Sequence, residues 1–176
     1  SSGIGLKSIS GTTAGFYTDN NPTQLQFQDT TIFVVFESTG GGNGGELLYR
    51  SMGTGNPSWS AGVHRGTYNG YRVIINGVTS DYSGTPVDHD GVFGSITHCL
   101  VCSMGGDELI LSSNRKEYPS GFSYSGGIDY SRTDVGIHIN LAFNKLATQF
   151  TGVLYSCGIF GKKLDRAESK VVALNY

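Results

Sequence analysis

The last stretch of the sequence reads Phe150-Thr-Gly-Val-Leu-Tyr-Ser-Cys-Gly-Ile-Phe-Gly-Lys-Lys-Leu-Asp-Arg-Ala-Glu-Ser-Lys-Val-Val-Ala-Leu-Asn-Tyr176, and two different periods follow one another in it. In its first half, apolar side chains stand at every second position. Because successive side chains of a strand point to opposite faces, this alternation predicts a half-buried strand with one apolar face. The residues predicted for that face are Val153, Tyr155, Cys157 and Ile159.

The second half of the same stretch predicts a short helix. Asp165 is a suitable N-cap, and Glu168 stands where the carboxylate of a capping box belongs. An apolar face follows at Val171, Val172 and Leu174. We expect this face to be buried at the edge or in the core of the strand layers, so that the helix closes the fold.

This ending resembles the C-terminal pattern of laminin G-like, or concanavalin A-like, jelly-roll domains. The matching positions are Gly152, Phe160, Leu164, Glu168, Leu174 and Tyr176. Many relatives carry an acid in the middle of the strand, where this sequence has Ser156, so no role of that acid is carried over. The resemblance implies an all-β fold, a two-sheet antiparallel jelly-roll sandwich with one short C-terminal helix, in which the first strand pairs beside the last.

The composition agrees with many short strands joined by tight turns. Among 176 residues there are 27 Gly, 10 Tyr and 9 Phe, and only 15% are charged. The length fits a single domain, residues 1–176, and the start at Ser1 without a Met predicts an excerpt of a longer protein. A net charge of −2 without a cluster of Lys or Arg disfavours nucleic acid, and the short apolar runs disfavour membrane insertion.

The cysteines predict free thiols. Cys99 and Cys102 are three positions apart in a strand-like run, so they face opposite ways and neither bridge nor share a metal easily. An odd count in apolar surroundings favours buried thiols in a protein folded in a reducing cytosol. A bridge from either of them to Cys157, and metal binding or catalysis, are the alternatives.

The sequence predicts several further strands, turns and loops. Thr31–Glu37 is apolar on both faces and predicts a central strand covered on each side. The pairs Asn69-Gly70 and Asn76-Gly77 predict tight hairpin turns. Short strands are expected at residues 15–17, 25–27 and 135–140, another hairpin around 105–107, and long loops at 79–94 and 119–134.

The sequence offers little catalytic or metal-binding chemistry. No strand carries two carboxylates at the spacing that glycoside hydrolases of this fold use. Asp88 and Asp90 resemble part of a calcium loop, but the later Glu and the repeated Asx are missing. A polysaccharide lyase needs a base and a cation, and the candidates near one hairpin are His64, Arg65, Tyr68 and Tyr71. However, His64 and Arg65 are consecutive, so in a strand they should point to opposite faces. We therefore predict no catalytic residues, no metal and no cofactor.

Aromatic and polar residues around one hairpin predict a carbohydrate site. Rings stack on sugar faces, while amide and guanidinium groups bond sugar hydroxyls. The predicted contact residues are Trp59, His64, Arg65, Tyr68, Asn69, Tyr71 and Tyr82.

We therefore expect a non-catalytic recognition module for a glycan or a glycosylated cell surface, acting at an extracellular or virion surface. Free cysteines and the missing start favour a phage tail fibre or another viral or bacterial surface protein, with homo-oligomers formed through the parent protein. A polysaccharide lyase or hydrolase on the same fold, and a structural or oligomerisation domain, are the alternatives.

Overall fold

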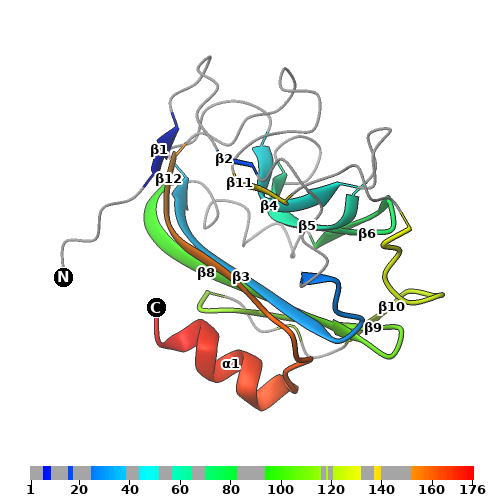
Figure 1. Ribbon diagram of the computed structural model, residues 1–176. Helices are drawn as coiled ribbons and strands as arrows, with labels where there is room; N and C mark the ends of the chain where they lie inside the picture. Colours follow the sequence, from blue (N-terminus) through cyan, green and yellow to red (C-terminus); the bar gives the residue numbers. More distant parts are fainter. Residues whose placement is uncertain are drawn as a thin grey trace.

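A computed structural model shows two antiparallel sheets packed face to face, with one short helix at the C-terminal end (Figure 1). The structure describes residues 6–8, 16–17, 25–38, 44–51, 57–64, 70–82, 94–115, 118, 121–131, 137–139 and 152–176. Within these residues each sheet has six strands. The predicted fold class, an all-β jelly-roll sandwich with a C-terminal helix, is confirmed.

The strand order of each sheet follows from its hydrogen-bonded neighbours. Sheet A runs in the order β1 (Leu6–Ser8), β12 (Gly152–Phe160), β3 (Thr30–Ser38), β8 (Gly94–Gly105), β9 (Glu108–Ser113) and β10 (Phe122–Ser123). Sheet B runs in the order β2 (Phe16–Tyr17), β11 (Ile137–Ile139), β4 (Gly44–Ser51), β5 (Pro57–His64), β6 (Gly70–Ile75) and β7 (Val78–Tyr82). As the resemblance implied, the first strand pairs with the last: Leu6 lies opposite Leu154.

Strand β3 is the central strand that the sequence predicted, because it is covered on both faces. Ile32, Val34 and Phe36 point into the space between the sheets, and all three are fully buried. Phe33 and Val35 point to the other side, where they pack in a second, smaller cluster. Apolar side chains on both faces therefore suit a strand with sheet B on one side and α1 on the other.

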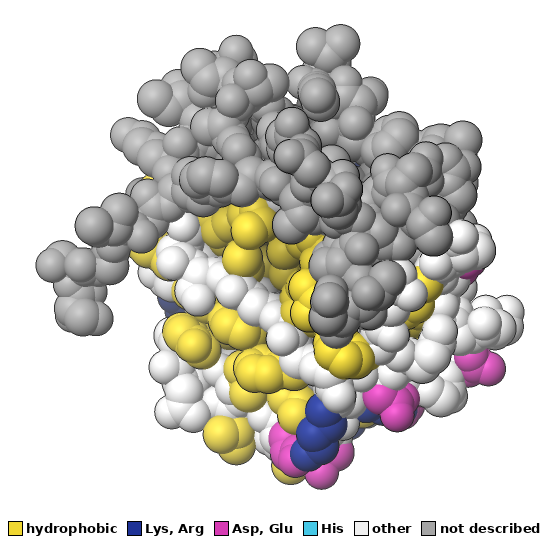
Figure 2. Space-filling model, viewed as in Figure 1, with side chains coloured by type: hydrophobic (Ala, Val, Ile, Leu, Met, Phe, Trp, Pro, Cys, Tyr) yellow, Lys and Arg dark blue, Asp and Glu magenta, His cyan; other side chains and the backbone are white. Residues whose placement is uncertain are grey.

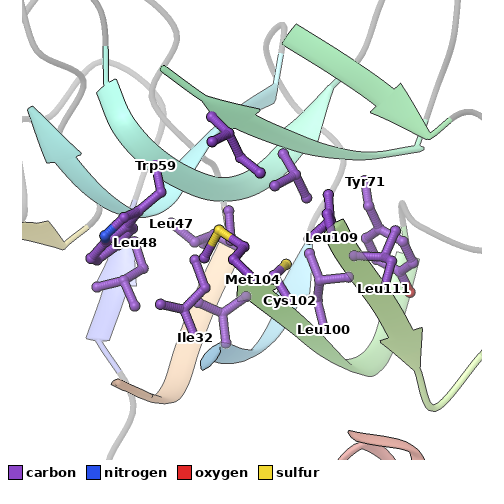
Figure 3. Packing of buried hydrophobic residues seen from close by; sticks show 14 of the residues in the cluster. Ile32, Leu47, Leu48, Trp59, Tyr71, Leu100, Cys102, Met104, Leu109 and Leu111 are labelled. Atoms are coloured by element: carbon purple, nitrogen blue, oxygen red, sulfur yellow. The ribbon is translucent and has the colours of Figure 1, made fainter. Parts of the chain in front are cut away.

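The main core lies between the two sheets (Figure 3). Inward-pointing residues of β3, β4, β5, β6, β8, β9, β11 and β12 together form one continuous apolar layer. Its largest fully buried side chains are Trp59, Phe36, Ile32, Leu47, Leu48, Leu100, Met104, Leu109 and Leu111. The cysteines follow the predicted alternation: Cys102 belongs to this core and Cys99 to the outer cluster. All three cysteines are free thiols.

The predicted alternation along β12 is wrong for half of the strand, because a bulge interrupts it. The register with β3 shifts between Leu154 and Ser156, so Tyr155 is the extra residue. Leu154 lies opposite Phe36 and faces the core, and Cys157 and Ile159 pack against the core after the bulge. Tyr155 is exposed instead, and its hydroxyl reaches Glu37 on the outer side of sheet A.

Helix α1 (Arg166–Leu174) lies on the side of sheet A that faces away from sheet B (Figure 1). The predicted capping box is present, because the Asp165 carboxylate accepts the backbone N–H of Glu168 and the Glu168 carboxylate accepts that of Asp165. The predicted buried face is wrong in part. Ala173 and Ser169 are buried and Val172 packs on the outer cluster, whereas Leu174 is 59% exposed.

The helix is therefore a cover over the outer face of sheet A and not a plug for the core. Two side chains of the sheet fix its start: Ser103 Oγ donates to the Leu164 carbonyl, and Thr31 Oγ1 accepts the Leu164 N–H. No helix among the described residues is long and apolar enough to cross a membrane.

Two tight turns agree with the sequence, and three other predicted segments need correction. Asn76 and Asp107 adopt positive φ values of 52° and 60°, as the tips of the β6–β7 and β8–β9 hairpins require. Residues 25–27 do not form a strand, and β7 extends to Tyr82 into the predicted loop. The predicted loop at 119–134 contains the short strand β10. Outside the described residues lie positions 83–93 of the predicted loop and Asn69 of the predicted Asn69-Gly70 hairpin turn.

Candidate functional site

Three of the seven predicted carbohydrate contacts, His64, Tyr71 and Tyr82, lie close together along the backbone at one end of sheet B. His64 ends β5, Gly70 begins β6 as its register partner, and Tyr71 lies opposite Tyr82, which ends β7. The backbone thus brings His64, Tyr71 and Tyr82 to neighbouring positions on three adjacent strands. Arg65, Tyr68 and Asn69 belong to the connection between β5 and β6 and lie outside the described residues.

Two of the predicted contacts, Trp59 and Tyr71, lie in the core between the sheets (Figure 3). Trp59 has no exposed surface, and Tyr71 is almost fully buried. A ring without an accessible face does not stack on a sugar, so these two rings support the strands that carry the predicted site. The alternation of Trp59, Ala61 and Val63 along β5 was the signal in the sequence that points to burial.

Trp59 belongs to a buried group at the far end of β5. Arg50 lies opposite Trp59 in the register of β4 and β5, and its guanidinium carbon lies 4.6 Å from the centre of the Tyr130 ring. Burial lowers the pKa of the Arg50 guanidinium, and the Tyr130 ring offers it a cation–π contact. Tyr130 in turn donates its hydroxyl hydrogen to the Phe27 carbonyl at 2.8 Å. The group connects β4 and β5 to the segment before β3.

Tyr71 forms a buried polar bridge between the two sheets. Its hydroxyl lies 2.8 Å from His98 Nδ1 and 2.7 Å from Ser113 Oγ. A hydroxyl has one hydrogen to donate and lone pairs to accept with, so Tyr71 satisfies both partners. Burial raises the pKa of Tyr71 to about 12, which keeps the phenol protonated. The His98 ring also stacks on Phe36, with ring centres 5.3 Å apart.

The segment 121–131 covers the opposite end of the sandwich and is fastened to both sheets. Gln28 exchanges two hydrogen bonds with the backbone of Ile128, both 2.8 Å long. Asn76, at the β6–β7 turn, donates to the Gly127 carbonyl and accepts from the Asp129 N–H. Since Gln28 precedes a strand of sheet A and Asn76 belongs to sheet B, this segment ties the two sheets together.

An exposed aromatic row lies on the outer face of sheet A, beside α1. We define the row as Tyr155, Phe160 and Tyr176, and the Phe33 ring contacts the last two of these. The Phe33 ring centre lies 5.6 Å from that of Phe160 and 5.6 Å from that of Tyr176, and both pairs are stacked. Figure 2 shows hydrophobic side chains gathered on this face, over β12 and α1. Phe160 and Tyr176 belong to the C-terminal fold pattern, and no local pattern in the sequence places them together.

The charged groups near the aromatic row form ion pairs with each other. Lys162 Nζ lies 2.7 Å from Glu168 Oε1, and Lys163 Nζ lies 2.7 Å from Glu108 Oε2. The hydrogen bonds from these lysines lower the pKa of each carboxylate. Tyr155 donates to Glu37 Oε2 at 2.9 Å, and this bond raises the pKa of the Tyr155 phenol. Two ion pairs therefore involve the segment between β12 and α1, and the Glu37 carboxylate is bound by the Tyr155 hydroxyl.

Metal-binding chemistry is not assembled in the described part of the chain. No group of three or more His, Cys, Asp or Glu side chains that suits a metal ion occurs there. Asp88 and Asp90, the two candidates from the sequence, lie outside the described residues.

No protein-family model matches the sequence, and no curated protein sequence matches it. Solved structures do match. The CBM40 module of the Ruminococcus gnavus IT-sialidase, bound to α2,3-sialyllactose, is 15% identical, with 96% of each chain covered and a TM-score of 0.72. The SAP-like pentraxin of Limulus polyphemus is 8% identical, with 96% of this chain and 79% of the pentraxin covered and a TM-score of 0.65.

The binding domain of botulinum neurotoxin serotype D is 11% identical, and the match covers 95% of this chain and 42% of that structure, with a TM-score of 0.65. At these identities the likeness concerns the fold. All three structures are β-sandwiches, and the present chain shares that architecture. The resemblance stated from the sequence is thus confirmed at the level of the fold.

Proposed function

We propose that this chain is a non-catalytic recognition module that binds carbohydrate, as a free glycan or on a glycosylated cell surface. The observation that supports this most is the likeness of fold, over 96% of both chains, to a module solved with α2,3-sialyllactose. The botulinum neurotoxin match is a binding domain as well. Recognition outside the cell is the setting that suits such a module, and extracellular action is part of the proposal.

The proposed contacts lie at the end of sheet B where β5, β6 and β7 meet. His64 and Tyr82 stand at that end, and Arg65, Tyr68 and Asn69 connect β5 to β6. Guanidinium and amide groups bond hydroxyls or a sugar carboxylate, and tyrosine rings stack on sugar faces. Tyr71 supports this end from within the core, whereas Trp59 is buried at the far end of β5.

A glycan array tests the proposal. We expect the wild type to bind a defined set of glycans, with sialyllactose among the probes. The variants Arg65→Ala and Tyr68→Ala should bind about tenfold more weakly, which corresponds to about 1.4 kcal/mol. Thermal melting of each variant shows whether the fold is retained. A wild type that binds no glycan on the array, although it is folded, contradicts the proposal.

The alternatives make different predictions. A polysaccharide lyase or hydrolase releases unsaturated products or new reducing ends, whereas a recognition module leaves the glycan intact. A structural or oligomerisation domain binds no glycan and self-associates. An origin in a phage tail fibre, and homo-oligomers formed through the parent protein, stay predictions of the sequence.

A further inference from the structure

We propose that the outer face of sheet A carries a second carbohydrate-binding site, the aromatic row of Tyr155, Phe160 and Tyr176. Its ligand is an elongated glycan chain that lies along β12. This inference rests on the proposed glycan-binding function, but it uses the sheet opposite to the β5–β6 hairpin. The two sites therefore lie on different sheets and can be tested separately.

Exposure is the first argument for a binding surface. Tyr155, Phe160 and Tyr176 are 40%, 43% and 55% exposed, and they belong to a small set of large hydrophobic residues that the fold leaves in solvent. Helix α1 packs mainly over β8 and β9, and Ala173 also packs against Phe33 and Val35 of β3, whereas Tyr155 and Phe160 of β12 stay exposed beside the helix.

The shape of the row is the second argument. Gly158 lies opposite Phe33 in the register of β12 and β3, and a Cβ atom at Gly158 would lie 2.4 Å from the Phe33 ring. The missing side chain thus lets Phe33 lie close against β12. Phe160 and Tyr176 each stack on the Phe33 ring, with ring centres 5.6 Å apart. These three rings form one aromatic group, and its exposed ring surface suits contact with the apolar faces of sugar rings.

The polar border is the third argument. Tyr155 donates to Glu37 Oε2 at 2.9 Å, so a phenol and a carboxylate stand together at one end of the row. Both groups have hydrogen-bonding capacity beyond that one bond, and sugar hydroxyls can use it. A purely apolar partner would remove water from these two polar groups without offering them hydrogen bonds in return.

The size of the row decides between a glycan and a protein partner. Three rings exposed to this extent offer only about 300 Å² of surface, if a whole aromatic side chain has about 200 Å². A stable protein interface buries about 800 Å² on each partner. The row is therefore too small to hold a second copy of the chain on its own, but it is large enough for a few sugar rings.

The test measures binding of cellohexaose, maltohexaose and chitohexaose, together with their disaccharides, by isothermal titration calorimetry. We expect the wild type to bind at least one hexasaccharide, and its disaccharide at least tenfold more weakly. Tyr176→Ala and Phe160→Ala should each weaken the hexasaccharide about tenfold, and Tyr155→Phe should weaken it less. The matched control is Leu174→Ala, an exposed apolar side chain on α1 outside the row, which should bind as the wild type does.

Three results overturn the inference. The first is a wild type that binds none of the hexasaccharides. The second is unchanged hexasaccharide binding in folded Tyr176→Ala and Phe160→Ala. If Arg65→Ala weakens glycan binding in that case, the proposed function holds and only the second site fails. The third is a wild-type dimer in sedimentation that Tyr176→Ala dissociates, since the row would then be an interface between copies. Tyr176→Ala keeps the test valid if Phe160→Ala does not fold.

Discussion

Replacing Trp59 with Ala should destabilise the fold strongly, because the indole is fully buried between the sheets. Burying an aromatic side chain removes about 150–250 Å² from water, which corresponds to about 4–6 kcal/mol at ~25 cal/mol per Å². Measured losses for Trp→Ala in protein cores are about 3–5 kcal/mol. For a domain of this length, each kcal/mol lowers the Tm by about 2–4 °C, so we expect a decrease of about 6–20 °C.

Urea denaturation followed by circular dichroism measures this loss directly, as the change in the free energy of unfolding. Leu174→Ala is the control, because Leu174 is 59% exposed on α1 and its loss should change stability by less than about 0.5 kcal/mol. Trp59→Ala within about 1 kcal/mol of the wild type, together with lost glycan binding, would refute the reasoning. The indole would then contact the ligand, as the sequence alone predicted.

Other predictions concern the buried bridge, the acid range and calcium. Tyr71→Phe removes the hydroxyl that His98 and Ser113 share, so the free energy of unfolding should fall by about 1–3 kcal/mol in urea denaturation; an unchanged midpoint contradicts the bridge. The hydrogen bond from Lys163 lowers the pKa of Glu108 below 4.5, so this pair stabilises the fold above that pH and ceases to do so as the pH falls through the lowered value. Between neutral pH and about pH 3, the Tm of Lys163→Met should therefore decrease less than the Tm of the wild type, and equal decreases contradict this. Calcium and a chelator should give the same Tm, and a shift of several degrees indicates a site at Asp88 and Asp90.

Local patterns in the sequence predicted the elements that depend on neighbouring residues. The capping box at Asp165 and Glu168 depends on residues three positions apart, and the Asn76-Gly77 turn needs only its own backbone conformation. The apolar run of β3 likewise shows that both faces are covered. In each case the residues that determine the element lie within one short stretch, so the sequence alone was enough to predict it.

Features that depend on distant residues were missed for a physical reason. Alternation shows that a strand has two faces, but it does not show where a bulge such as Tyr155 exchanges them. The helix pattern likewise gave an apolar stripe that includes Leu174, whereas the close approach of α1 to sheet A favours the small side chain of Ala173. The contact of Phe33 with Tyr176 joins positions far apart in the chain, and no local pattern contains it.

The candidate site was predictable only in its place along the chain. The hairpin between β5 and β6 exists, and β7 pairs beside it as expected. Which of its rings face solvent depends on the position of sheet A, and that position placed Trp59 and Tyr71 inside. Contact of Arg65, Tyr68 and Asn69 with a glycan stays a prediction.

We propose that this sandwich binds a glycan and leaves it chemically unchanged. Titration calorimetry of the wild type with its best array ligand, followed by mass spectrometry of the recovered glycan, tests binding and cleavage in one sample. We expect saturable binding and a recovered glycan of unchanged mass. A cleaved glycan would show that the chain is an enzyme, and the absence of binding heat with every array ligand would contradict a recognition function.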